Sequence, residues 1–181
     1  GLSEVAGGRT YEVRPEKTEV ASRMSRGRSL ADLSAIQRNL LRKERLDTPY
    51  KLLAADVTTN GTISVADLSA IQALLLRKSN TYAAGLWRFV PADYVFADTN
   101  SPWEAPASRG YTNLLSDRVG EDYVGMKLGD VNASWTPAAG AQSLTRQGVR
   151  GGEGWPVEIG LSEHWAHPGE RVRVEVRGQG F

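Results

Sequence analysis

The sequence predicts an α+β fold: a duplicated loop-and-helix unit that carries short β-strands, with strand-forming segments at both ends of the chain. The main observation is a repeat, in which residues 29–43 (SLADLSAIQRNLLRK) recur as residues 64–78 (SVADLSAIQALLLRK) and differ at three of 15 positions. Duplication at an offset of 35 residues predicts two equivalent units. Short aromatic and alternating runs after the second copy, and near each end of the chain, are typical of strands.

Each copy of the repeat has the period of an amphipathic helix. Capping-box pairs, Ser29 with Asp32 and Ser64 with Asp67, can start both helices without any metal. Pro49, which follows Asp47 and Thr48, predicts a short connecting helix with a capped start. Apolar residues recur at intervals close to one helical turn, so we expect two apolar stripes that face each other: Leu33, Ile36, Leu40 and Leu41, and Leu68, Ile71, Leu74 and Leu75.

The twelve residues from Asp56 to Asp67 (DVTTNGTISVAD) have the spacing of a calcium-binding loop. Ca²⁺ takes six to eight oxygens, and such a loop supplies them from positions 1, 3, 5, 7, 9 and 12, with glycine at position 6 for a sharp turn. Gly61 falls at position 6. The alternative is an ordinary turn followed by a capping box. The expected ligands are Asp56, Thr58, Asn60, the carbonyl of Thr62, Ser64 and Asp67.

We expect one calcium site and not two. Arg23, Arg26 and Arg28 precede Asp32, and three cations there repel a divalent ion. The segment 130–134 (DVNAS) could begin a second loop, but it lacks glycine at position 6 and an acid at position 12, so it predicts an Asx turn. Because the loop at 56–67 has only two carboxylates, its calcium binding is expected to be weak.

Strand signals occur on both sides of the repeat. Tyr11 and Val13 alternate before Pro15 and predict a strand. The runs WRFV (87–90), YVF (94–96) and YVGMKL (123–128) are expected to form a small sheet or an extended arm on the helix pair. Residues 135–154 are rich in small and polar residues and predict a linker. Two more strands are expected at 157–161 and 172–176.

Composition and motifs argue against several functions. The chain has 22 Lys and Arg against 21 Asp and Glu, so no overall field favours nucleic acid or an anionic membrane. It has no cysteine, which excludes disulfides, thiol nucleophiles and Cys-ligated zinc. His164 and His167 lack a third metal ligand, and the sequence has no P-loop, dinucleotide fingerprint or nucleophile elbow. We therefore expect no catalysis, and we expect the five tryptophans to pack in cores.

The two loop-and-helix units, with DLSAIQ in each helix and a Pro-Tyr-Lys connector, resemble a dockerin, the EF-hand-like (type I) calcium-dependent module that binds cohesin domains. The resemblance is closest to dockerin-like modules of bacterial cell-surface or secreted multidomain proteins, because WRFV, DYVF and YVGMKLGDVN follow in the same order. It implies four parts: a terminal strand of a preceding β-sandwich domain (1–17), a dockerin-like module with a β extension (18–135), a linker (136–154) and the start of a cohesin-like β-sandwich domain (155–181).

The resemblance implies a non-catalytic, calcium-binding protein–protein interaction and assembly module of a large extracellular or cell-surface protein. The alternatives are a structural spacer packed on its own neighbouring domains, or a non-catalytic appendage of a secreted hydrolase. We expect a cohesin-like or other β-sandwich partner, in the same or a like chain, and neither nucleic acid nor membrane insertion. Dockerins bind cohesin through the loop ends and the exposed helix face, which here correspond to Leu30, Ala31, Gln37, Arg38, Arg42, Val65, Ala66, Gln72, Ala73 and Arg77.

Overall fold

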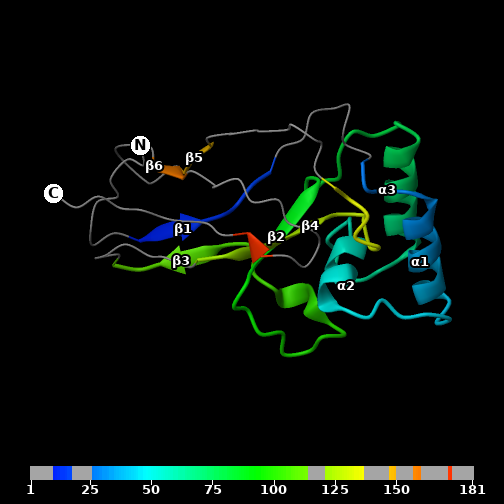
Figure 1. Ribbon diagram of the computed structural model, residues 1–181, viewed down its shortest axis with the longest axis horizontal. Helices are drawn as coiled ribbons and strands as arrows, with labels where there is room; N and C mark the ends of the chain where they lie inside the picture. The colour runs from blue at the N-terminus through cyan, green and yellow to red at the C-terminus, as the bar shows by residue number, and fades with distance from the viewer. Residues whose placement is uncertain are drawn as a thin grey trace.

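The described residues form an α+β fold of three short α-helices and small antiparallel sheets, and the α+β class is the one that the sequence predicts. The computed structural model describes residues 10–17, 26–113 and 121–136, and the backbone of strands at 147–149, 157–159 and 171–172. Helices α1 (Leu30–Leu40), α2 (Pro49–Ala55) and α3 (Val65–Leu75) gather at one end of the molecule, and strands β2 and β4 lie beside them (Figure 1). None of the helices in the described part of the chain is long and apolar enough to cross a membrane.

All three helices start where the sequence predicts. Ser29 and Ser64 are the N-caps of α1 and α3, and each forms the complete capping box with the aspartate three residues later. The Thr48 side chain caps α2 by accepting a hydrogen bond from the Lys51 N–H. These local bonds supply partners for N–H groups that a helix cannot pair internally.

The apolar stripes are confirmed at their centres and wrong at one end. Ile36 and Ile71 are fully buried in the shared core. Leu41, expected in the stripe of the first helix, is instead 65% exposed. It lies one residue beyond α1, as the C-cap, and Arg42 then takes a left-handed conformation (φ 55°) that turns the chain away.

The sheet next to the helices pairs β2 (Trp87–Pro91) with β4 (Tyr123–Lys127) in antiparallel register. Phe89 lies opposite Gly125, where a Cβ would be 3.0 Å from the Phe89 ring. Strand β7 (Arg171–Val172) borders β4 on its other side. The strands predicted around WRFV and YVGMKL are therefore confirmed.

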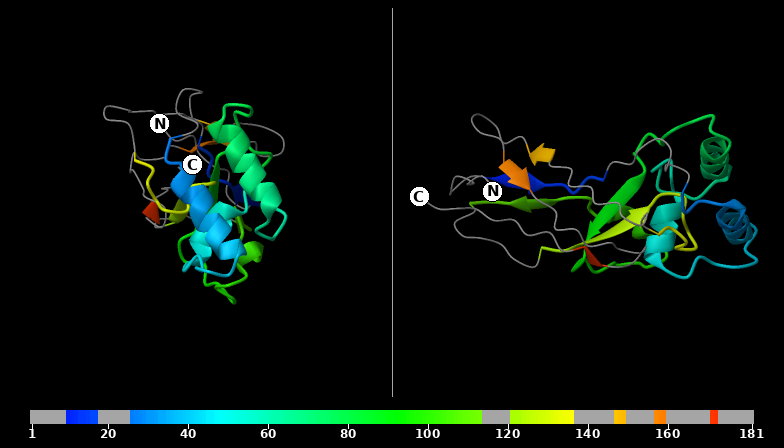
Figure 2. Two further views of the ribbon diagram at one scale, coloured as in Figure 1. Left: turned by 90° about the vertical axis from the view of Figure 1, so that its right-hand side faces the viewer. Right: turned by 45° about the horizontal axis from the view of Figure 1, so that its top comes forward.

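Two shorter strand pairs complete the described sheets (Figure 2). Strand β1 (Tyr11–Val13), predicted from the sequence, pairs with β3 (Arg109–Tyr111), which was not predicted. Strand β5 (Gln147–Val149) lies in the stretch expected to be a linker and pairs with β6 (Val157–Ile159), which falls within a predicted strand. The rest of residues 137–181, with His164 and His167, lies outside the described residues.

The run YVF (94–96) is not a strand, because the chain turns there: the Tyr94 N–H donates to the Pro91 carbonyl oxygen (3.0 Å). Its aromatic side chains pack instead. The Phe96 ring lies edge-on to Tyr94 (5.1 Å between ring centres) and to Tyr50 of α2 (5.4 Å). The neighbouring 3₁₀ helix η2 (Pro102–Glu104) places Trp103 in the same cluster.

One core joins the helices to the sheet and to the segment after β4. Trp87 and Trp135 are both buried and meet edge-on, with ring centres 4.9 Å apart. The Tyr123 hydroxyl donates to the Val13 carbonyl oxygen (3.0 Å), which ties the strand near the N-terminus into the core. Packing is thus the role of Trp87 and Trp135, as expected from the sequence.

Candidate metal-binding loops

The first predicted ligand, Asp56, directly follows α2 and is 1% exposed. One carboxylate oxygen accepts a hydrogen bond from the Asn60 N–H (3.1 Å), and the other accepts from the Gly61 N–H (3.0 Å). Gly61 has φ +79°, the left-handed conformation expected at the sharp turn of the loop. The loop therefore closes around the Asp56 carboxylate.

The last predicted ligand, Asp67, is fully buried in the first turn of α3. Its Oδ1 accepts from the backbone N–H (3.0 Å) and the hydroxyl (2.8 Å) of Thr58, and its Oδ2 accepts from the N–H (2.8 Å) and the hydroxyl (3.1 Å) of Ser64. The Thr58 hydroxyl is also 3.4 Å from Asp56 Oδ1. The loop thus brings Asp56, Thr58 and Asp67 together.

Asn60 and Thr62 lie at the exposed rim of the same loop. The side-chain oxygen of Asn60 accepts from the N–H and the hydroxyl of Thr62, both at 3.0 Å. The loop therefore buries its two carboxylates and leaves Asn60 and Thr62 exposed.

The two buried carboxylates have few positive charges near them. None of the ion pairs formed by the described residues involves Asp56 or Asp67. Burial lowers the pKa of Arg88, and the charge of Asp56 partly opposes this shift, but Arg88 donates to backbone carbonyls and not to Asp56. Within the described residues no group of three or more His, Asp or Glu side chains could hold a metal. An ion in this loop would have to rely on two carboxylates and on neutral oxygens.

A second loop of the same kind is assembled from two distant segments. Asp32, fully buried in the first turn of α1, accepts from the N–H and hydroxyl of Ser29 through Oδ2 (2.8 and 3.0 Å). Its Oδ1 accepts from the N–H groups of Val131 (2.9 Å) and Asn132 (3.2 Å), about 100 residues later. Asp32 thus matches Asp67, but its partner segment lies after β4.

Asp130 repeats the bonds of Asp56. Its carboxylate accepts from the N–H groups four and five residues later, Ser134 (3.0 Å) and Trp135 (2.8 Å). A buried valine follows each aspartate, and the fourth residue of each loop has a positive φ: 55° at Thr59 and 59° at Ala133. We name this assembly of residues 27–32 with residues 130–135 the split loop, and residues 56–67 the continuous loop.

The split loop both confirms and corrects the sequence-based expectation. The Asn132 side chain accepts from the Ser134 N–H (3.0 Å), as an Asx turn requires. However, the acid that this segment lacks is supplied by Asp32. The Ser134 hydroxyl donates to the Gly27 carbonyl oxygen (2.9 Å), which joins the two segments a second time. The signal that could have revealed the match is the Asp-Val pair shared by residues 56–57 and 130–131.

Arg28 lies beside the split loop, as the sequence suggested, and its guanidinium donates to two backbone carbonyls. It is buried, Nε donates to the Leu128 carbonyl oxygen, and Nη2 donates to the Leu86 carbonyl oxygen (3.3 Å). Burial raises the pKa of Asp130 above its ordinary value and the charge of Asp32 adds to this, while N–H groups of the loop and Arg28 oppose it. Arg26 is exposed, and Arg23 lies outside the described residues.

The residues expected to contact a partner lie at the surface. Leu30 is 75% and Val65 70% exposed. Ala73 is half-buried, and the others are exposed: Ala31, Gln37, Arg38, Arg42, Ala66, Gln72 and Arg77. The exposed faces of α1 and α3 are therefore available to a partner.

Comparison with known proteins adds no relative. The chain matches no protein-family model, and no curated protein or solved structure is recognisably similar to it. Function is therefore argued from the two loops and the helix faces.

Proposed function

We propose that this chain is a non-catalytic, calcium-binding interaction and assembly module of a large extracellular or cell-surface protein, with a duplicated EF-hand-like core similar to that of a dockerin. The observation that carries the proposal is the continuous loop, in which two buried carboxylates without an ion pair converge on one hydroxyl. Burying carboxylates is costly unless hydrogen bonds or a cation compensate their charge.

The donor set favours calcium over other metals. Asp56, Thr58, Asn60, the Thr62 carbonyl, Ser64 and Asp67 offer only oxygens, which hard cations prefer. A flexible twelve-residue loop suits the irregular coordination of Ca²⁺ better than the strict octahedron of Mg²⁺. With two carboxylates we expect a dissociation constant of about 10⁻⁴ to 10⁻³ M, typical of extracellular modules. At about 1 mM calcium, such binding would stabilise the fold by about 0.4 to 1.4 kcal/mol.

We propose one ion and not two, although the split loop offers similar oxygens. In the split loop the positive charge of Arg28 is close enough to oppose the rise in the pKa of Asp130 that burial causes. A fixed positive charge there opposes a divalent cation. In the continuous loop the corresponding position is the uncharged Ile63.

Calorimetric titration with calcium tests both the ion and its number. The wild type should bind one ion, Asp56→Asn should lose the binding heat because one of the two carboxylates is gone, and the matched variant Asp130→Asn should keep it. Circular dichroism checks that both variants remain folded. No heat in the wild type would overturn calcium binding. Two ions, one of them lost in Asp130→Asn, would overturn the single site.

We further propose a cohesin-like or other β-sandwich domain of the same or a like chain as the partner. The exposed apolar residues Leu30 and Val65 support it, because such surface is often covered by a covalent neighbour. Covalent footprinting tests this by comparing how readily these helix faces are labelled in the intact parent protein and in the isolated chain. If Leu30, Gln37, Val65 and Gln72 are labelled equally in both, no neighbour covers them, and a separate partner replaces this proposal. Protection by a neighbour with no effect on assembly would favour the structural spacer.

A further inference from the structure

The connection between β2 and β3, residues 92–108, lies against the continuous loop. Its 3₁₀ helix η2 contacts α2, the helix directly before the buried Asp56. A Cβ added at Gly61 would lie 3.9 Å from both Cβ and Cγ of Trp103, an ordinary van der Waals separation. Trp103 therefore covers the left-handed turn whose N–H groups donate to the Asp56 carboxylate.

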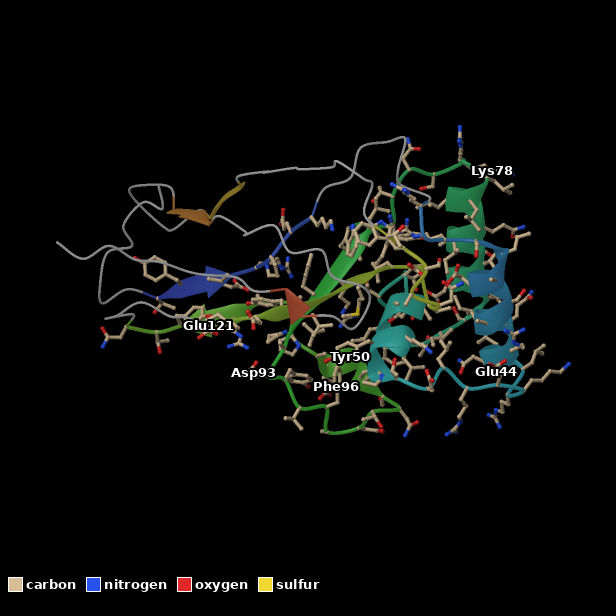
Figure 3. The ribbon with its side chains drawn as sticks, viewed as in Figure 1. Glu44, Tyr50, Lys78, Asp93, Phe96 and Glu121 are labelled. Carbon is tan, nitrogen blue, oxygen red and sulfur yellow. The ribbon has the colours of Figure 1, made fainter. Side chains whose placement is uncertain are left out.

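Trp103 is itself fixed by a core cluster and by Arg88 of β2. Its half-buried side chain packs against buried residues that also hold the rings of Tyr50 and Phe96, which lie side by side next to α2 (Figure 3). Arg88 Nη2 donates to the carbonyl oxygens of Trp103 (3.4 Å) and Ala105 (3.3 Å). These contacts tie η2 to the sheet, so the indole has a fixed position beside the turn.

Among the described residues, Trp103 alone comes within 4 Å of that Cβ, apart from the two chain neighbours of Gly61. Those neighbours, Asn60 and Thr62, are two of the proposed ligands, and the structure leaves Asn60 and Thr62 exposed. A turn that is already held in place loses less conformational freedom when an ion binds, and this lowers the free-energy cost of binding. The contact with Trp103 therefore bears on calcium affinity.

We infer that Trp103 is a positioning residue of the continuous loop, which holds the turn at Gly61 in the conformation that calcium binding needs; this inference rests on the proposed function and deepens it. The split loop has a parallel feature, because its left-handed Gly27 lies against Trp135. Trp135 belongs to the split loop, whereas Trp103 comes from outside the continuous loop. The twelve-residue loop is thus completed by a side chain that no loop motif includes.

Substitutions at Trp103 test this, with calorimetry for calcium affinity and hydrogen exchange for the turn. Trp103→Ala should weaken calcium binding by at least about fivefold and speed exchange of the Asn60 and Gly61 N–H groups without calcium. Trp103→Phe keeps Cβ, Cγ and a ring, so its affinity should differ from that of the wild type by less than about twofold. The matched control Phe96→Ala removes another half-buried ring from the same cluster and should change affinity by less than about twofold, with no faster exchange at the turn.

A second variant, Arg88→Lys, loosens η2 without a change in net charge. Lysine keeps the positive charge but loses the guanidinium bonds to the carbonyl oxygens of Trp103 and Ala105. It should weaken calcium binding about threefold and speed exchange at the same two N–H groups. Circular dichroism checks the fold of each variant, and Arg88→Lys replaces Trp103→Ala if the latter does not fold.

Two results would overturn the inference and leave the proposed function standing. One is wild-type calcium affinity and wild-type exchange in Trp103→Ala. The other is an equal loss in Phe96→Ala, which would make Trp103 a core residue with no special relation to the loop. If the wild type gives no calcium heat, the proposed function is lost, and exchange at Asn60 and Gly61, measured without calcium, still decides whether Trp103 holds the turn.

Discussion

The continuous loop and the split loop reach the same hydrogen-bond arrangement by different routes. In the continuous loop Thr58 and Asp67 are nine residues apart, whereas in the split loop Val131 and Asp32 are 99 residues apart. Loop-closure entropy grows only with the logarithm of length, so the longer closure costs about 2 kcal/mol more. Burial of Val131 and Trp135 in the main core offsets this cost. The continuous loop is positioned by α2 and α3, the helices on either side of it. The split loop can form only when the sheet of β2 and β4 places residue 130 beside the start of α1.

The largest expected effect tests whether α1 and α3, which follow the two loops, contribute equally to the free energy of unfolding. Ile36→Ala and Ile71→Ala should each lower the free energy of unfolding by about 2 to 5 kcal/mol, because both side chains are fully buried. Gln37→Ala and Gln72→Ala, on the exposed face, should each cost less than about 0.5 kcal/mol. Urea denaturation measures all four. A clearly smaller loss for one isoleucine would show that its unit is not part of the shared core.

The next effect distinguishes the loops through their glycines. Gly27 has φ +80°, and a Cβ there would lie 2.4 Å from the Trp135 Cβ. Gly27→Ala should therefore cost about 2 to 5 kcal/mol, through both the left-handed conformation and the clash. Gly61 has φ +79°, but its nearest neighbour, Trp103, is 3.9 Å away, so Gly61→Ala should cost only about 1 to 2 kcal/mol.

Thermal melts of the two glycine variants measure this difference. Hydrogen exchange of the Ser134 and Trp135 N–H groups, which donate to the Asp130 carboxylate, reports whether the split loop has opened. Equal losses of stability in the two variants would mean that the residues around Gly27 and Trp135 can move to make room for a Cβ. The split loop would then be packed no more closely than the continuous loop.

The sequence predicts those parts whose causes are local. Capping boxes at Ser29 and Ser64, and the capped proline start at Thr48, need only neighbours within four residues, and all three helix starts are confirmed. Gly61 likewise shows the expected turn. The end of the first stripe was missed because the length of α1 depends on the turn at Arg42, which no residue pattern marks.

The split loop was missed for a physical reason. Position 6 needs glycine only where the backbone is left-handed, as at Gly61 (φ +79°), and Trp135 is not among the described residues with a positive φ. In the split loop the left-handed glycine is Gly27, on the other side of the junction. A motif search along the chain cannot join two segments separated by a β-sheet.

A smaller effect concerns Tyr82, which lies beside the split loop. Its hydroxyl is buried without a hydrogen-bond partner, next to Gly129 and Arg28. Tyr82→Phe removes this unsatisfied group and should stabilise the protein by about 1 kcal/mol, whereas Tyr123→Phe, which removes the bond to Val13, should destabilise it by about as much. Urea denaturation at pH 8 compares the two, and a loss of stability in Tyr82→Phe would show that the hydroxyl has a water partner.

The same tyrosine predicts a pH dependence. Burial, and to a smaller degree the charge of Asp32, raises the pKa of Tyr82 to about 12, while Arg28 opposes this shift. Since the pKa is higher in the folded state, the unfolded state loses its proton first, and stability falls as the pH rises from about 10 to 12. At pH 11 this group should cost the wild type about 1.4 kcal/mol, and Tyr82→Phe should lack that loss. Denaturation at pH 8 and pH 11 checks the difference.

The smallest effect compares the fourth residue of each loop. Thr59 and Ala133 both have a left-handed conformation, which costs a non-glycine residue about 1 to 2 kcal/mol and costs a β-branched residue the most. Glycine removes this cost but adds about 0.4 to 1 kcal/mol of freedom to the unfolded chain. Thr59→Gly should therefore stabilise the protein by about 0.5 to 1 kcal/mol, and Ala133→Gly by less than about 0.5 kcal/mol. Neither variant removes a proposed calcium ligand, so calorimetry should give the same calcium heat as for the wild type. If Ala133→Gly proved the more stabilising, backbone strain at the fourth residue would be greater in the split loop. Joining its two segments would then strain the backbone at Ala133.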